Sequence, residues 1–178
     1  QLQRFVAQKM PRALRRECDQ NHTWPREIFK ELADMGLIGL TVEEKHGGSG
    51  QDLVASVAVI EELAQVGPFL AGPYIHAAFY GGMNLSENGS EAQKEALLPK
   101  IVNGELLLSY GLSEPNVGGD LASVETRAEK KAGKIVVNGT KRWCTGADWS
   151  NYIYCLVRSG EAGARYKNLS MLLIPTDT

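Results

Sequence analysis

Residues 110–120, with the sequence YGLSEPNVGGD, constrain the fold most, because they separate two halves with different hydrophobic patterns. Before them, apolar residues recur at helical spacing, and after them come short apolar runs typical of strands. Pro115 and the pair Gly118–Gly119 interrupt regular structure, so this stretch is predicted to be a loop. The pattern predicts an α+β protein, with an all-helical N-terminal domain over residues 1–107 and a β domain over residues 108–178.

The first helices can be bounded from their breakers. Residues 2–19 are amphipathic, but Pro11 must kink or divide that helix. A second helix is expected to start at Pro25, since proline is tolerated at the first helical position. Gly36 is placed to end it as the residue after the C-cap.

Three further helices are expected before the loop. Residues 53–64 are apolar on nearly every side, which predicts a central and largely buried helix. Residues 73–85 form another helical stretch. Ser90 and Gln93 make a capping box, which opens a last helix that ends near residues 103–104.

The second half reads as strands. Residues 126–129 and 135–137 are expected to pair across a turn at Ala132–Gly133. Asn138–Gly139 is the strongest hairpin signal in the chain, because both residues tolerate positive φ, and residues 140–144 are the expected return strand. These strands predict an antiparallel meander.

The meander continues with residues 152–157 and 169–174, which are continuous apolar runs. No closing strands follow them, so we expect an incomplete antiparallel β-barrel-like domain and further chain downstream.

Composition excludes several classes of protein. The chain has 178 residues, of which 43% are hydrophobic and 22% charged, with a net charge of −2. That balance gives no reason to expect nucleic acid or an anionic membrane as a partner. No apolar run is long enough to span a bilayer, and no targeting segment is recognisable.

The cysteines and histidines point to no disulfide framework and no metal site. The three cysteines lack CxxC spacing, and the three histidines lie far apart in the sequence. Free thiols suit a reducing compartment, so we expect a cytoplasmic protein, or a mitochondrial matrix protein in a eukaryote.

Residues 110–120, which we call the 110–120 loop, also contain groups that could bind a ligand. Ser113 offers a hydroxyl, and the backbone N–H groups around it can form a nest for an anion. The Gly118–Gly119 pair lets the backbone approach a ligand closely. Such a loop suits a diphosphate or the electron-rich edge of a heterocycle. The alternative is a plain connector between a helical and a β layer.

Residues 141–145, which we call the 141–145 segment, form the second candidate. Trp143 and Thr145 point to the same side of an extended chain, so an indole plane and a hydroxyl could together hold a flat ring. The alternative is that Trp143 packs in the core.

The two segments in this order resemble the signature sequences of the acyl-CoA dehydrogenase family. The pattern is Tyr-x-Leu-Ser-Glu-Pro-x-x-Gly-x-Asp in the 110–120 loop, then Lys-x-Trp-x-Thr in the 141–145 segment. Further similarity lies at residues 36–50, 60–64 and 93–104. The resemblance covers nearly the whole chain and implies the family's N-terminal helical domain and part of its middle β domain, without its C-terminal helical domain.

The resemblance implies FAD as cofactor and assigns residues to it. Tyr110, Leu112 and Ser113 would border the isoalloxazine, with the Leu112 N–H and the Ser113 hydroxyl facing its N1/O2 edge. Gly118 and Gly119 would lie near the diphosphate and the mouth of the acyl-CoA site. Many family members have serine where this chain has Gly119, so substrate contact there would be through the backbone alone.

The 141–145 segment completes the cofactor set that the resemblance implies. Trp143 would pack against the flavin and Thr145 would hydrogen-bond near its N5 atom. Cys144 lies between them and would contribute backbone contacts.

The implied function is dehydrogenation of an acyl-CoA thioester to the trans-2-enoyl-CoA, in fatty acid and lipid metabolism. Electrons would pass to an electron-transferring flavoprotein, and the enzyme would be a homo- or hetero-oligomer. The family's catalytic base is a carboxylate in the absent C-terminal domain, so this chain alone is expected to be an inactive fragment. Glu61, Glu62 and Glu114 are not assigned as substitutes.

Two other functions stay open. One is an acyl-CoA oxidase, which lets oxygen reach the flavin. The other is a non-catalytic subunit that binds flavin or acyl-CoA. Within the acyl-binding helices that the resemblance implies, the small pair Gly81–Gly82 suggests room for a bulky acyl group.

Overall fold

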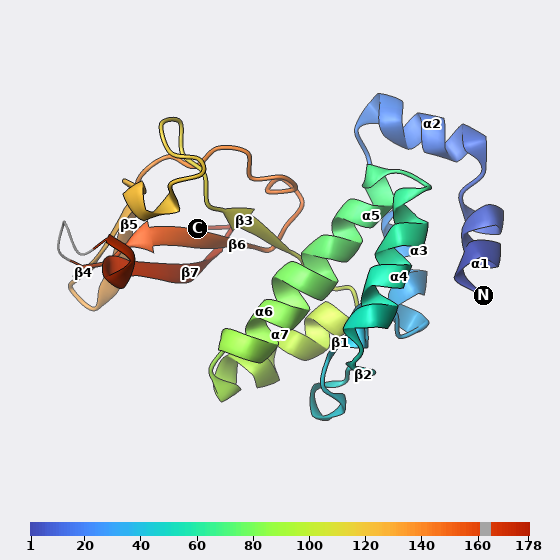
Figure 1. Cartoon of the computed structure of the whole chain (residues 1–178), viewed down its shortest axis with the longest axis horizontal. Coiled ribbons are helices and arrows are strands. Elements are labelled where there is room, and N and C mark those ends of the chain that lie inside the picture. The colour runs from blue at the N-terminus through green and yellow to red at the C-terminus, as the bar shows by residue number, and fades with distance from the viewer. Residues whose placement is uncertain (161–164) are drawn as a thin grey trace. The chain divides into compact units, whose positions relative to one another are not determined.

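The chain forms a helical unit and a β unit. The computed structural model describes residues 1–160 and 165–178 (Figure 1). Internal packing divides the chain into two compact units, Gln1–Leu107 and Leu108–Thr178. The first is helical apart from one short strand pair, and the described part of the second is built on one open sheet, so the predicted α+β class is confirmed.

The helices of the first unit follow one another closely along the chain. They are α1 (Leu2–Lys9), α2 (Arg12–Asn21), α3 (Arg26–Asp34), α4 (Leu53–Ala64), α5 (Pro68–Tyr74), α6 (Asn84–Asn88) and α7 (Glu91–Val102). A π-helical segment, Ile75–Met83, joins α5 to α6. The short strands β1 (Thr41–Val42) and β2 (Gly50–Gln51) pair antiparallel between α3 and α4.

Most helix ends follow the local signals in the sequence. Pro11 divides α1 from α2, as predicted. Gly36 follows the end of α3 with φ of +77°, a conformation that glycine adopts without strain. The capping box is confirmed, because the Ser90 N–H donates to Gln93 Oε1 at 2.9 Å and the Gln93 N–H donates to Ser90 Oγ at 3.3 Å.

Helix α4 is not the buried helix that its composition predicted. The side chains of Leu53, Val54 and Val57 are 54%, 82% and 49% exposed. Its buried face is the stripe of Ser56, Val59 and Leu63. The prediction was wrong because an almost uniformly apolar helix has no polar face to show which side the core will cover.

The π-helical segment is supported by polar side chains from outside it. The Thr41 hydroxyl donates to the Ala78 carbonyl at 2.6 Å, and Asn84 Nδ2 donates to the Phe79 carbonyl at 3.1 Å. A Cβ atom at Gly82 would lie 2.6 Å from Thr41 Oγ1. Strand β1 therefore fills the space beside Gly82, and the suggested room for a bulky acyl group is not found at this residue.

The second unit contains a five-stranded sheet within the described residues. Its strands are β3 (Leu108–Gly111), β4 (Arg127–Lys131), β5 (Lys134–Asn138), β6 (Tyr152–Arg158) and β7 (Leu169–Pro175). Strand β6 pairs antiparallel with β7 along its whole length, and Figure 1 shows these two strands side by side in orange and red.

The sheet is mixed rather than wholly antiparallel. Strand β3 pairs parallel with β6, in the register Leu108 to Tyr152 through Gly111 to Cys155. Strand β4 joins β6 only at the pair Arg127–Arg158, also in parallel. Parallel pairing is accessible because long connections separate these strands along the chain. The predicted antiparallel pairing is therefore correct for β4–β5 and β6–β7. Strand β3 was not among the predicted strands, and its pairing with β6 is parallel.

The hairpin between β4 and β5 turns at Ala132 and Gly133, whose φ angles are +49° and +77°. That turn was predicted, but the second one, at Asn138–Gly139, was not found. Residues 139–144 form no strand. A Cβ atom at Gly139 would lie 2.3 Å from Thr126 Oγ1, so this glycine permits a close approach of two chain segments.

Strand β6 forms the centre of the core, with alternate residues on its two faces. Leu156 packs with Val117 and Val124 on one face, and Cys155 and Val157 pack with Ala128 on the other. Because Val117 belongs to the 110–120 loop, that loop is anchored against one face of the sheet.

We predict that Gly82→Ala lowers the free energy of unfolding by about 1–3 kcal/mol, because the added methyl group overpacks against Thr41. The measurement is urea-induced unfolding. The matched control is Gly72→Ala in α5, where a Cβ atom meets nothing within 4 Å. Higher helix propensity should make that control neutral or stabilising by up to about 1 kcal/mol. Equal effects of the two substitutions would contradict the packing described for Gly82.

Candidate functional site

Tyr110 and Gly111, predicted to be loop, form the end of β3, and the rest of the 110–120 loop continues from it into a tight turn. The Glu114 N–H donates to the Val117 carbonyl at 2.8 Å, and the Val117 N–H donates back to the Glu114 carbonyl at 3.2 Å. Pro115 stands at the second position of this turn, where its fixed φ is favourable. Val117 is buried, so the turn is pinned to the core while Gly118 and Gly119 beyond it are exposed.

The 141–145 segment lies directly against the 110–120 loop. The Arg142 N–H donates to the Ser113 carbonyl at 2.8 Å. Farther along, the Ser109 hydroxyl lies 2.9 Å from the Thr145 carbonyl and 2.5 Å from the Ser150 hydroxyl. Both ends of the segment are thus attached to β3 and its following loop, so the sequence-predicted residues Ser113, Trp143 and Thr145 belong to one local structure.

A buried ion pair makes the closest connection between the two segments. Lys141 Nζ donates to Glu114 Oε1 at 2.8 Å and to the Leu112 carbonyl at 3.0 Å. The side chains of Lys141 and Glu114 are only 10% and 5% exposed. We call this pair the Glu114–Lys141 junction. A buried pair of this kind is tolerated only where further hydrogen bonds satisfy it.

The Glu114 carboxylate has those further bonds. It accepts from the Glu125 N–H at 2.6 Å, from the Thr126 N–H at 2.9 Å and from the Thr126 hydroxyl at 2.5 Å. Burial by itself would raise the pKa of Glu114, but the hydrogen bonds from Lys141, Thr126 and the backbone lower that pKa to about 2. Glu114 is therefore ionised at neutral pH and is unsuited to accept a proton from a substrate.

Trp143 is presented to solvent rather than buried. Its side chain is 74% exposed, which rules out the alternative of core packing in this chain. Its backbone has φ of +61°, an uncommon and strained conformation for a bulky residue. The Arg142 guanidinium covers the indole ring at 4.3 Å from the ring centroid, and the Thr145 N–H donates to the Trp143 carbonyl at 3.0 Å.

Ser113 and Thr145 complete the exposed part of the site. Ser113 is half-buried and Thr145 is exposed. Within the described residues, the Ser113 hydroxyl makes no hydrogen bond with the protein. A Cβ atom at Gly118 or Gly119 would meet nothing within 4 Å, so both glycines border open space.

The remaining predicted residues have more structural surroundings. Tyr110 is half-buried, and its ring lies 5.7 Å from that of Tyr154. Leu112 packs against the core cluster of Val117 and Leu156. Burial raises the pKa of the Cys144 thiol, with Lys141 opposing this, so Cys144 is not a reactive thiolate at neutral pH.

Sequence reasoning missed the residues that hold the site together. Lys141, Ser109 and Thr126 were not among the predicted site residues. Lys141 did fall within the quoted Lys-x-Trp-x-Thr pattern, which was the only signal available for it. Nothing in the sequence indicates that Glu114 binds residues 11 and 12 positions later, because those contacts depend on the folded path of the chain.

The other carboxylates and the first glycine loop have ordinary roles. Glu61 is exposed on α4, and Glu62 accepts a hydrogen bond from Gln3 Nε2 at 2.7 Å. In residues 46–50, a Cβ atom at Gly48 would lie 1.9 Å from the Val42 carbonyl oxygen, so this glycine serves packing against β1.

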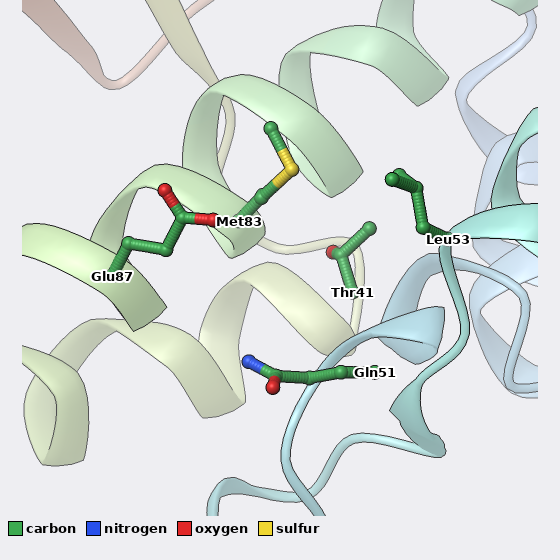
Figure 2. A pocket seen from close by; sticks show the side chains of 5 residues that line it. All are labelled: Thr41, Gln51, Leu53, Met83 and Glu87. Atoms are coloured by element: carbon green, nitrogen blue, oxygen red, sulfur yellow. The ribbon is translucent and has the colours of Figure 1, made fainter.

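Two pockets are lined by residues outside the predicted site. The first, of about 190 Å³, is in the helical unit and is lined by Thr41, Gln51, Leu53, Met83 and Glu87 (Figure 2). The second, of about 430 Å³, is in the β unit and is lined by Ala122, Ser123, Arg158 and Arg165.

Two negative findings apply to residues 1–160 and 165–178. No group of three or more His, Cys, Asp or Glu side chains is arranged to hold a metal ion there. In the same stretches, no helix has the length and apolar character needed to cross a membrane.

Sequence comparison matches both units to one family. The profile of the acyl-CoA dehydrogenase N-terminal domain matches residues 1–105, and that of the middle domain matches residues 109–178. The mitochondrial isovaleryl-CoA dehydrogenase of Bos taurus is 37% identical over 131 residues, which are 72% of this chain and 31% of that protein. A probable acyl-CoA dehydrogenase of Bacillus subtilis is 32% identical over 160 residues, or 90% of this chain and 42% of that protein.

Structural comparison agrees. The crystal structure of an acyl-CoA dehydrogenase from Geobacillus kaustophilus matches with a TM-score of 0.89 and 29% identity, over 99% of this chain and 46% of that one. The chain thus spans less than half the length of these relatives.

We predict that Glu114→Gln lowers the free energy of unfolding at pH 7 by about 2–3 kcal/mol, since it removes a carboxylate whose folded pKa is depressed. A depressed pKa contributes stability above the ordinary value of 4.5, and that contribution is lost as the pH falls to about 2. The difference between variant and parent should therefore shrink across this window when urea unfolding is followed against pH.

The matched control is Glu129→Gln. Glu129 pairs with Lys131 at 2.7 Å, but both side chains are exposed. Such a pair contributes about 0–1 kcal/mol, so the control should change stability little at any pH. A Glu114→Gln effect that is equally small would contradict the buried network.

Proposed function

Because the chain belongs to the acyl-CoA dehydrogenase family, we propose that it provides the flavin-binding part of an enzyme that oxidises acyl-CoA thioesters to trans-2-enoyl-CoA. The observation that carries this proposal is the attachment of the 141–145 segment to the 110–120 loop. The Arg142 N–H binds the Ser113 carbonyl, so an accessible hydroxyl and an exposed indole lie in adjacent segments.

The residues present fit FAD. The exposed Trp143 ring offers a flat apolar surface for stacking against another ring. The Ser113 hydroxyl, which has no partner among the described residues, can donate to a ring heteroatom. Gly118 and Gly119 border open space in which a diphosphate can approach backbone N–H groups. When bound, FAD supplies acceptance of the hydride that leaves the acyl chain.

In this proposal each site residue has one task. Ser113 and the Leu112 N–H would hold the N1/O2 edge of a bound flavin, as donors to the negative charge that a reduced flavin carries. Fixed donors of this kind stabilise that charge without reorganising. Trp143 would exclude water from one side of the ring, and the Thr145 hydroxyl would hold the ring as a donor near N5. Tyr110 and the Cys144 backbone border the cofactor, and Gly118 and Gly119 border the diphosphate and the substrate entrance.

We assign no proton acceptor to this chain. Glu114 is ionised but fully engaged in the buried junction, and Glu61 belongs to the separate helical unit. We infer that a carboxylate from a family region not matched here removes the substrate proton. The residues described would then bind and orient the cofactor, and the chain alone would not turn over.

Electron-transferring flavoprotein is the proposed acceptor, and an oligomer is the proposed assembly. The alternative of an oxidase differs only in letting oxygen accept the electrons. The alternative of a non-catalytic flavin-binding subunit shares the cofactor site but would never produce enoyl-CoA.

The proposal is tested with the intact protein, purified and loaded with FAD. We expect a yellow protein whose melting temperature rises with added FAD, by a stabilisation of about 2.7 kcal/mol at a hundredfold excess over the Kd. Isovaleryl-CoA and butyryl-CoA are the first substrates to test, with an artificial electron acceptor and mass-spectrometric detection of the enoyl-CoA. A colourless protein that FAD does not stabilise would overturn the proposal, and flavin binding without enoyl-CoA would favour the non-catalytic subunit.

We predict that Trp143→Ala weakens FAD binding by about two- to tenfold, the loss expected when an aromatic stacking contact worth roughly 0.5–1.5 kcal/mol is removed. The measurement is titration of the protein with FAD. The matched control is Tyr166→Ala, which also removes an exposed aromatic ring covered by a neighbouring arginine. We expect unchanged FAD affinity in the control, and an unchanged affinity in Trp143→Ala would remove Trp143 from the site.

A further inference from the structure

We propose that Lys141 is a positioning residue that orients the Leu112–Ser113 peptide, so that the Ser113 N–H is presented to the flavin as a fixed donor. This inference rests on the function proposed above and adds to it a residue outside the assigned site. It is carried by the contacts of the Lys141 ammonium, which reaches the backbone of the 110–120 loop from within the protein.

The first step is the direction of one peptide group. Lys141 Nζ donates to the Leu112 carbonyl at 3.0 Å. The structure contains no cis peptide bond among its described residues, and in a trans peptide the C=O and the following N–H point in opposite directions. A Leu112 carbonyl held by Lys141 therefore turns the Ser113 N–H away from Lys141.

The second step is that the neighbouring peptide is held as well. The Arg142 N–H donates to the Ser113 carbonyl at 2.8 Å. Consecutive carbonyls at Leu112 and Ser113 thus both bind residues of the 141–145 segment. Because Lys141 holds the carbonyl of the Leu112–Ser113 peptide and Arg142 holds the next carbonyl, that peptide has little freedom to rotate, and the Ser113 N–H keeps one direction.

The third step is that Lys141 is itself immobilised. Its ammonium is bound to the Glu114 carboxylate at 2.8 Å, and three donors from Glu125 and Thr126 hold that carboxylate. The Lys141 stem passes close to Gly111, where a Cβ atom would lie 3.4 Å from Lys141 Cγ and 2.9 Å from Ile153. Gly111 therefore leaves the space through which the lysine reaches the loop.

The contact with Lys141 also strengthens the Ser113 backbone N–H as a hydrogen-bond donor. A cation on a carbonyl oxygen polarises the whole peptide group, which makes the attached N–H a better donor. Because Glu114 balances the lysine charge nearby, the effect reaches the flavin through the oriented N–H rather than through a free positive charge. Such a donor binds an electron-rich ring edge and binds it more tightly once negative charge has developed there.

The test compares Lys141→Met with the parent in the intact protein. We expect FAD to bind about tenfold more weakly, in keeping with one weakened hydrogen bond. The reduced form should lose about tenfold more affinity than the oxidised form, which corresponds to a fall of about 30 mV in the two-electron reduction potential. Both quantities are measured by titration and by spectroelectrochemistry, and neither requires turnover.

The controls separate positioning from general stability. Lys94→Met makes the same change at another largely covered lysine, whose ammonium pairs with Glu91 at 3.0 Å in the helical unit, and it should alter neither quantity. Lys141→Arg keeps a cation with several donors and should restore most of the potential. If Lys141→Met does not fold, Lys141→Gln, which keeps a donor but no charge, should show a smaller fall in potential than 30 mV.

Each outcome decides one question. A folded Lys141→Met or Lys141→Gln variant that binds FAD with the parent's affinity and potential would overturn the positioning role and leave the proposed function intact. A parent protein that binds no FAD would overturn the proposed function, and the inference would fall with it. Loss of affinity without any change in potential would also contradict the inference, because a purely structural role predicts that result.

Discussion

The buried carboxylate of Glu114 is the interaction on which the second unit depends. Four donors bind it: the backbone N–H groups of Glu125 and Thr126, the Thr126 hydroxyl and the Lys141 ammonium. Three stretches that are separate in the sequence thereby meet at one point. Without the carboxylate, two backbone N–H groups and an ammonium would be left poorly satisfied in a desolvated setting, which is costly.

The sheet supplies the platform for this network. Strand β6 places Leu156 against the 110–120 loop and Cys155 on the opposite face, so this one strand contributes to the core clusters on both faces of the sheet. Parallel pairing of β3 with β6 brings the start of the loop to the sheet, and Ser109 on β3 then holds the far end of the 141–145 segment. Hydrogen bonds on both sides of Trp143, at Arg142 and at Thr145, hold its backbone in a strained conformation while its indole ring stays exposed to solvent.

The sequence alone predicted features that depend on neighbouring residues, such as helix ends, and missed contacts between segments that are distant in the chain. The division at Pro11 and the capping box at Ser90 follow from backbone chemistry within a few residues, and both were predicted correctly. Gly139 was misread as a hairpin residue because a glycine needed for close approach to Thr126 looks the same as one needed for a turn. The exposed face of α4 and the Glu114–Lys141 junction were invisible for the same physical reason, since burial and pairing are decided by distant segments. The family signature nevertheless pointed to the two segments that the structure joins.

We propose above all that the 110–120 loop and the 141–145 segment bind the same isoalloxazine ring. The most direct measurement is a crystal structure of the intact protein with FAD bound. We expect the isoalloxazine to contact the Trp143 indole on one side and to hydrogen-bond to Ser113 along one edge. A flavin bound elsewhere, or one that touches only one of these two residues, would contradict it.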